Sequence, residues 1–224
     1  MQALRTLRAA PRAPLTYRLP RNALRSLATT ADYPTVSDAI KNDHRELESY
    51  YNNILSATDV DTKIRWQNQY VWELARHSIG EELIVYPAFE QYLKPGGESM
   101  AAKDRAAHQD IKERLYEFQS MYPTDTNFEG TLKSLMATVK EHIIEEEEHD
   151  LPALEKALKA GATDGDSAGL AKSFVRTKML VPTRSHPSAP DRPPWETVAG
   201  LMAAPIDKIR DIFARFPKEA TPKA

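Results

Sequence analysis

Two stretches of the chain carry a histidine and a glutamate four residues apart. His77 is followed by Glu81, and His142 by Glu146, and a proline stands ten residues after each histidine. On a helix, residues four apart lie on the same face, so each stretch would point an imidazole and a carboxylate in one direction. Imidazole and carboxylate together suit a hard or borderline metal ion such as iron. The repetition therefore indicates two metal half-sites.

A single histidine precedes each of these pairs by a similar interval. His44 stands 33 residues before His77, and His108 stands 34 residues before His142. A histidine or glutamate that faces a protein interior is costly unless it is paired or bound to a metal. We therefore expect the six side chains to meet around metal. The predicted ligands are His44, His77, Glu81, His108, His142 and Glu146.

Other side chains near these positions are candidates for additional ligands or for hydrogen-bonding partners of the ligands: Asp104, Glu82, Glu147 and His149. Asp104 stands four residues before His108 on the same face, whereas Lys112, four residues after it, is a poor ligand while protonated. His149 shares the face of His142 and is interpreted as a core residue or a neighbour of the ligands. The remaining acids of the run from 145 to 148 are expected on a solvated face.

The predicted ligands fall on four helices whose apolar residues recur at intervals of three and four. These helices are expected at about 35–57, 59–93, 98–121 and 128–160. Pro87 is expected to kink the second helix one turn past Glu81. Tyr51 and Tyr70 are expected in the core, where they could approach the metal. Because no segment alternates with period two, the predicted fold is all-α, an antiparallel up-down four-helix bundle over residues 35–160.

Composition restricts both the fold class and the kind of metal site. The chain is 41% hydrophobic and 28% charged, which is enough to bury a core. It has no cysteine, so thiolate sites, Fe–S clusters and disulfides are excluded and any metal must be held by nitrogen and oxygen. A net charge of -2 gives no basic surface for nucleic acid. No apolar run approaches the roughly 20 residues of a transmembrane helix.

The N-terminal residues 1–31 differ from the rest of the chain. They contain six arginines and no acid, which is typical of a mitochondrial transit peptide. Cleavage after Leu27 would change the net charge from -2 to -8. We expect a mitochondrial, matrix location; the alternative is a basic extension on a cytoplasmic protein.

The C-terminal part is expected to be a Gly/Pro-rich linker over 161–194, followed by short amphipathic helices over 195–216 that Pro205 interrupts. These helices are expected to fold back onto the bundle. The alternative is a contact with a membrane surface or a protein partner, because Lys208, Arg210 and Arg215 flank their apolar face.

The order His44, His77-x-x-x-Glu81, His108 and His142-x-x-x-Glu146 resembles the hemerythrin-like, or HHE cation-binding, domain, and the tail resembles the C-terminal extension of fungal members. The resemblance implies a four-helix bundle that holds two non-haem iron ions bridged by carboxylates, with zinc or manganese as substitutes. Oxygen-carrying members place two histidines four residues apart on the third helix. This chain has Asp104 and Lys112 at those positions, which favours iron sensing, storage or a redox response over dedicated oxygen transport.

Three functional hypotheses follow. The first is a metal-binding protein that also binds oxygen or another small diatomic or peroxide ligand. The second is an enzyme that uses the same centre to remove peroxide or nitric oxide, and the third is an interaction module with a structural metal. A ferritin-like centre needs Glu-x-x-His on two helices. Here the motif fits once, at Glu146 and His149, and the residue three positions after Glu73 is Arg76 instead of a histidine. The oligomeric state is left open.

Overall fold

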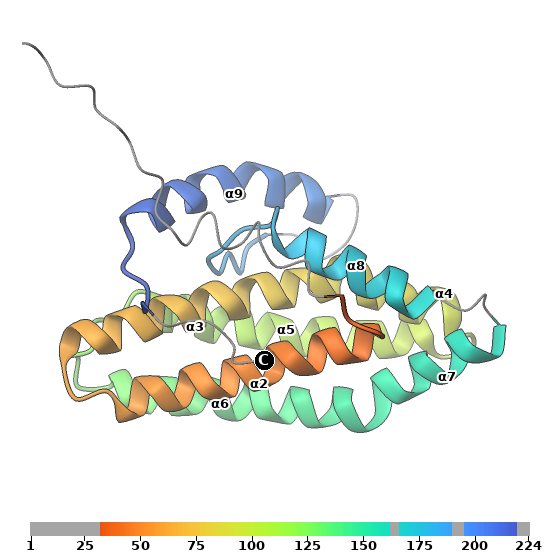
Figure 1. Cartoon of the computed structure of the whole chain (residues 1–224), viewed down its shortest axis with the longest axis horizontal. Helices are drawn as coiled ribbons and strands as arrows, with labels where there is room; N and C mark the ends of the chain where they lie inside the picture. The colour runs from red at the N-terminus through yellow and green to blue at the C-terminus, as the bar shows by residue number, and fades with distance from the viewer. Residues whose placement is uncertain (1–31, 162–165, 190–194, 219–224) are drawn as a thin grey trace, which may run out of the picture.

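The computed structural model describes residues 32–161, 166–189 and 195–218, and it is helical throughout these ranges apart from short connections (Figure 1). The predicted all-α bundle is confirmed. Its four rods are α2 (Val36–Ser56); α3 (Val60–Gly80) with η1 (Glu81–Val85) and α4 (Tyr86–Tyr92); α5 (Gly97–Gln119); and α6 (Phe128–Glu145) with η2 (Glu146–Asp150) and α7 (Leu151–Gly161). The predicted transit peptide, residues 1–31, lies outside the described residues.

The first two rods begin at side chains that cap their N-termini. The Thr35 side chain accepts a hydrogen bond from the Asp38 N–H at 3.0 Å, and Asp59 accepts one from the Thr62 N–H at 2.9 Å. Such caps satisfy N–H groups that the first helical turn leaves without a partner. Between α4 and α5 the chain turns through Gly96, whose φ of 119° favours glycine. These short connections bring consecutive rods together as antiparallel neighbours.

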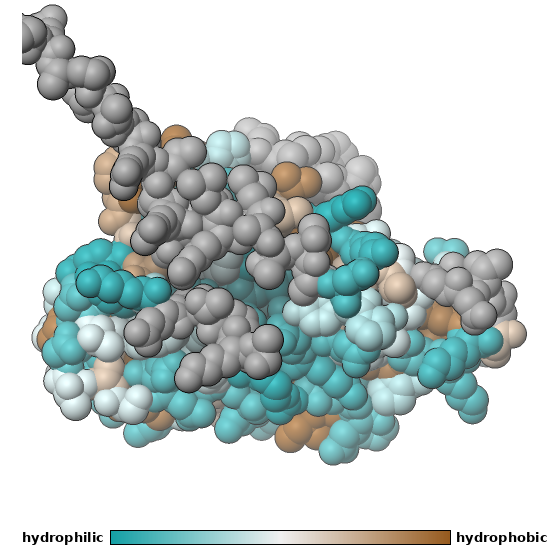
Figure 2. All heavy atoms as spheres, in the orientation of Figure 1, coloured by the Kyte–Doolittle hydropathy of each residue, from teal (hydrophilic) through white to brown (hydrophobic). Residues whose placement is uncertain are grey.

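The core consists of two apolar clusters with a polar layer between them. One cluster includes Leu47, Leu74 and Leu135, and the other includes Ile40 and Phe89. The four predicted histidine ligands fall between these clusters along their helices and are buried. Outward faces are polar, and Figure 2 shows a mostly hydrophilic surface over the bundle, as expected for amphipathic helices. None of the described helices combines the length and apolar character that crossing a bilayer requires.

Two rods contain a five-residue π-helical segment that begins at the glutamate of a histidine–glutamate pair. The Tyr86 N–H bonds to the Glu81 carbonyl, and the Leu151 N–H bonds to the Glu146 carbonyl, which are steps of five residues. A proline follows each segment, and a proline ring clashes with the carbonyl four residues before it in a regular helix. The wider π turn accommodates this ring, so the predicted kink near Pro87 takes the form of a π segment. The same device occurs before Pro152.

The prediction of a Gly/Pro-rich linker over 161–194 is wrong for its first half. Residues Asp166–Lys178 form α8, which lies along the bundle beside α2 and α3 (Figure 1). Burial of Ala171 and Phe174 against the second apolar cluster stabilises this helix. The predicted interruption at Pro205 is also wrong, because α9 (Trp195–Phe213) is one helix with Pro205 inside it.

The C-terminal segment folds back onto the bundle, as predicted. Arg65 donates to the Phe216 carbonyl at 3.1 Å, and Asn68 donates to the Arg215 carbonyl at 2.9 Å. Between α8 and α9, the Ser185 hydroxyl donates to the Lys112 carbonyl at 2.6 Å. Part of α9 faces outward, and the exposed side chains there include Ile206, Ile209 and Phe213.

Candidate metal centre

The structure brings all six predicted ligands together in the polar layer, and each is at most 7% exposed. α2 and α5 each contribute one histidine, while the other two rods each contribute a histidine and the glutamate that begins a π segment. The regular helical turn that precedes each π segment places histidine and glutamate on one inward face. The side chains are His44, His77, Glu81, His108, His142 and Glu146.

Each glutamate lies between histidines of two different rods. Glu81 Oε1 is 3.2 Å from His77 Nε2, and its Oε2 is 3.3 Å from His108 Nε2. Glu146 Oε2 is 3.4 Å from His44 Nε2 and 3.9 Å from His142 Nε2. Glu81 thus presents one oxygen to each of two histidines, as a bridging ligand would, whereas Glu146 presents the same oxygen to both of its neighbours.

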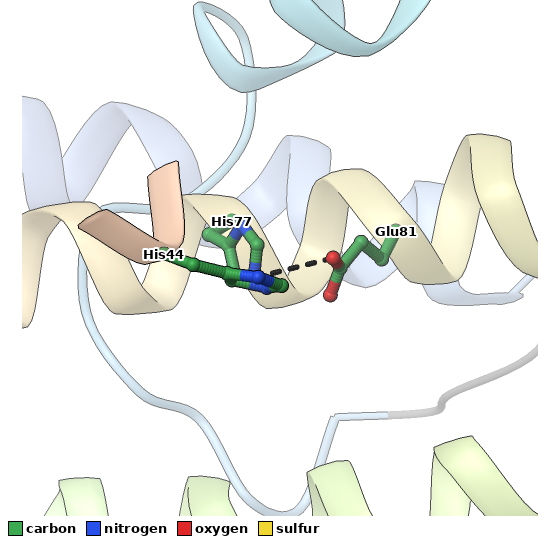
Figure 3. Close-up of side chains that lie close together, drawn as sticks. All are labelled: His44, His77 and Glu81. Carbon is green, nitrogen blue, oxygen red and sulfur yellow. Dashed lines mark ion pairs between the residues drawn. The ribbon is translucent and has the colours of Figure 1, made fainter. Parts of the chain in front are cut away.

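The histidines form two pairs. The ring centroids of His44 and His77 are 4.9 Å apart, and those of His108 and His142 are 4.7 Å apart. Figure 3 shows His44 and His77 converging on Glu81. In each of the two pairs, one nitrogen of each histidine and one Glu81 oxygen lie within 4.8 Å of one another. The arrangement therefore consists of two half-sites that share Glu81.

Five donor atoms of the centre lack a hydrogen-bond partner among the described residues, which tests whether a cation fits. Both oxygens of Glu81, both oxygens of Glu146 and Nε2 of His44 are buried without a hydrogen bond among the described residues. Such atoms cost free energy when they stay unpaired. Positive ions held among them would provide partners for all five atoms at once. The donor set, nitrogen and carboxylate oxygen without sulfur, suits iron, zinc or manganese.

Electrostatics keep two of the four predicted histidine ligands in the neutral form that binds metal. Burial and the neighbouring His108 lower the pKa of His142 to about 3, and burial with the neighbouring His44 holds the pKa of His77 well below its usual range. Both rings are therefore neutral at pH 7, the form that ligates metals. Burial and the Glu146 carboxylate raise the pKa of Glu81, because two buried anions repel each other. A cation between them would relieve that repulsion.

Three of the four histidines turn Nδ1 toward a carboxylate that is itself paired with a cation. The three arrangements are His44–Glu147–Arg45, His77–Asp43–Lys178 and His108–Glu82–Lys112. The Nδ1-to-oxygen distances are 2.8, 3.3 and 3.1 Å, in that order. A hydrogen bond from Nδ1 to a carboxylate fixes the tautomer and leaves the Nε2 lone pair for a metal. Glu82 and Glu147 are therefore hydrogen-bonding partners of the predicted ligands His108 and His44.

Asp104 and His149, the other two candidates, have opposite environments. Asp104 is buried, and one of its oxygens has no hydrogen-bond partner among residues 32–161, 166–189 and 195–218. Burial with the nearby Asp150 and Glu146 raises its pKa to about 8. The His149 side chain is 64% exposed and lies 3.8 Å from Glu145, so its predicted place on the inner face is wrong. The π segment from Glu146 changes the helical phase, which turns His149 outward and buries Asp150 instead.

The tyrosine at the centre is Tyr86, and not the two that the sequence suggested. Its buried hydroxyl lies 2.8 Å from His108 Nε2, and burial and the nearby Glu81 raise its pKa, so it stays protonated. Tyr70 instead approaches the Met136 sulfur at 3.6 Å, and Tyr51 packs at the edge of the first apolar cluster. Tyr86 follows Glu81 by five residues, which is one π turn. A proline six residues after a predicted ligand is the sequence signal that could have located it.

Comparison with known proteins gives two matches. The family model for the hemerythrin HHE cation binding domain matches residues 35–154. A hemerythrin-like protein of Schizosaccharomyces pombe is 58% identical over 182 residues, which cover 81% of this chain and 88% of that protein. No solved structure gives a significant match.

Proposed function

This chain belongs to the hemerythrin HHE cation-binding family, and we propose that it binds two iron ions in the polar layer of its bundle. His44 and His77 would hold one ion and His108 and His142 the other, with Glu81 shared between them and Glu146 as the second carboxylate. The observation that carries this proposal is the shared Glu81, whose two buried oxygens face different histidine pairs and have no hydrogen bond within the part of the chain that the structure describes.

The surrounding residues support a redox or sensing role over oxygen transport. Iron held by these residues would supply electrons and coordination positions for a small oxidant. Lys112 is paired with Glu82 at 2.7 Å, so it does not act as the additional nitrogen ligand of an oxygen carrier. The two apolar clusters exclude bulk water from either end of the centre. We place this role in the mitochondrion, because residues 1–31 hold six arginines and no acid.

The first prediction is that purified protein takes up roughly two Fe(II) ions per chain under anaerobic conditions and gains a visible absorption band in air. The paired change His77→Ala and His142→Ala is expected to abolish this uptake, because it removes one nitrogen ligand from each half-site. Metal analysis after gel filtration measures the stoichiometry. His186→Ala is the matched control. His186 is not one of the six predicted ligands, and its Nε2 pairs with Asp207 at 2.9 Å. Unchanged uptake in the paired variant would refute the proposal.

A second candidate function, reduction of peroxide or nitric oxide, is favoured by Tyr86. Its hydroxyl is a buried O–H donor 2.8 Å from His108 Nε2, where it could deliver a proton to a small oxidant. We expect Tyr86→Phe to keep the metal stoichiometry and to slow steady-state turnover with a chemical reductant. If the unaltered protein binds metal stoichiometrically but shows no turnover, the enzymatic function is refuted and the metal-binding function stands.

A further inference from the structure

Helix α8 lies outside the four rods, yet it reaches the outer side of the His44–His77 half-site. Phe174 is fully buried, and its ring meets the His77 ring edge-on, with centroids 6.1 Å apart. Gly80, beside the shared Glu81, permits this approach, because a Cβ there would lie 2.8 Å from Phe174 Cε2. The C-terminal part of the chain is thus packed directly against a metal-binding residue.

The last residue of α8, Lys178, carries its charge into a group of buried acids. Its ammonium pairs with Asp43 and Glu73, and it is 8% exposed. Asp43 in turn accepts from His77 Nδ1 at 3.3 Å. Asp43, Glu46 and Glu73 have carboxylate oxygens within 4.8 Å of one another, and such a group of like charges repels itself. Lys178 offsets this repulsion and holds Asp43 where His77 can donate to it.

The other half-site has an equivalent arrangement with a different origin. His108 donates to Glu82, which pairs with Lys112, and all three residues belong to the rods. In the arrangement His77–Asp43–Lys178, by contrast, the cation Lys178 comes from α8, and the other two residues belong to the rods. The two half-sites therefore resemble each other in their chemistry but differ in what supplies the outer positive charge.

We propose that α8 is a working part of the metal centre, in which Lys178 acts through Asp43 as a positioning residue for His77 and sets how tightly the His44–His77 ion is held. This inference rests on the proposed two-metal function. Partners of ligating histidines typically change metal affinity by about 10–100-fold when they are removed. Loss of the Lys178 charge removes the cation paired with Asp43, whereas Glu73 keeps its ion pair with Arg76 at 2.6 Å. Asp43 then no longer holds the His77 ring in place.

The test compares metal release from three lysine variants. Protein loaded with Fe(II) is mixed anaerobically with an excess chelator, and the loss of each ion is followed in time. In Lys178→Met, one of the two ions is expected to leave about 10–100-fold faster than in the unaltered protein, while the other keeps its rate. Lys178→Arg keeps the charge and is expected to restore slow release. Lys172→Met is the control, because Lys172 lies on α8 with 57% of its side chain exposed.

A further variant guards against misfolding. If Lys178→Met does not fold, the double change Asp43→Asn and Lys178→Met removes both charges together, and thermal unfolding of the metal-free protein verifies that it is folded. The double variant is expected to show the same fast release of one ion. Two ions bound by the unaltered protein with unchanged release in every Lys178 variant would overturn the role of α8 and leave the proposed function standing. No uptake by the unaltered protein would overturn the two-metal function itself.

Discussion

Glu81→Gln is expected to abolish the binding of both proposed metal ions with a single substitution. Glu81 presents one oxygen to His77 and the other to His108, so it contributes to both half-sites. The amide nitrogen of glutamine carries no lone pair for a metal, and a neutral amide lacks the charge that two cations require. Metal analysis after anaerobic loading is expected to fall from about two ions per chain to none.

The same substitution is not expected to damage the metal-free fold. Both Glu81 oxygens are buried and accept no hydrogen bond from the described residues, and burial with the adjacent Glu146 raises the pKa of Glu81. A buried carboxylate in such surroundings lowers the stability of the protein when no metal is bound. Glu81→Gln preserves the shape and removes the charge, so the free energy of unfolding of the metal-free chain should stay the same or rise by up to ~2 kcal/mol.

The control for Glu81 comes from the acidic run in η2. Glu148 is exposed and begins no π segment, so Glu148→Ala should retain both ions. Urea unfolding of metal-free protein and metal analysis of loaded protein separate stability from binding in both variants. Retention of two ions by Glu81→Gln would show that Glu81 is no shared ligand, and a large loss of metal-free stability would show that it supports the fold.

The sequence located the inward side chains wherever the helices are regular. His44 and His108 lie on uninterrupted helices, and His77 and His142 precede their glutamates by a regular turn of four residues. Amphipathic spacing therefore specified their faces correctly. Residue types and the repetition indicated two half-sites suited to an ion such as iron, and the family resemblance added the prediction that carboxylates bridge two irons.

Sequence reasoning failed where the helical phase changes or where distant packing decides the structure. The π segments turned His149 outward and brought Asp150 and Tyr86 inward, which a constant period of 3.6 residues misses. Helix α8 was missed for another reason. Its short apolar face is buried only because Gly80, far away in the sequence, leaves room for Phe174. Neither effect is visible in the local pattern of either segment.

Gly97→Ala is expected to be strongly destabilising although it adds one methyl group. Gly97 is buried at the start of α5, and a Cβ there would overlap the backbone carbonyl of Phe89 at the end of α4 and approach Cα of Glu90 to 3.2 Å. A side chain could rotate away, but two backbones in contact can separate only if α4 and α5 move apart. We expect a loss of about 3 kcal/mol or more in the free energy of unfolding, measured by urea titration.

Gly130→Ala is the matched control, because it makes the same chemical change without the clash. Gly130 lies in the first turn of α6, and a Cβ there would meet nothing within 4 Å. Alanine restricts the unfolded chain and favours helix, so this variant should gain about 0.5–1 kcal/mol. The two substitutions are therefore expected to change stability in opposite directions. Equal urea midpoints for the two variants would mean that α4 and α5 do not approach each other through Gly97. The position of α5, and of His108 on it, would then be wrong.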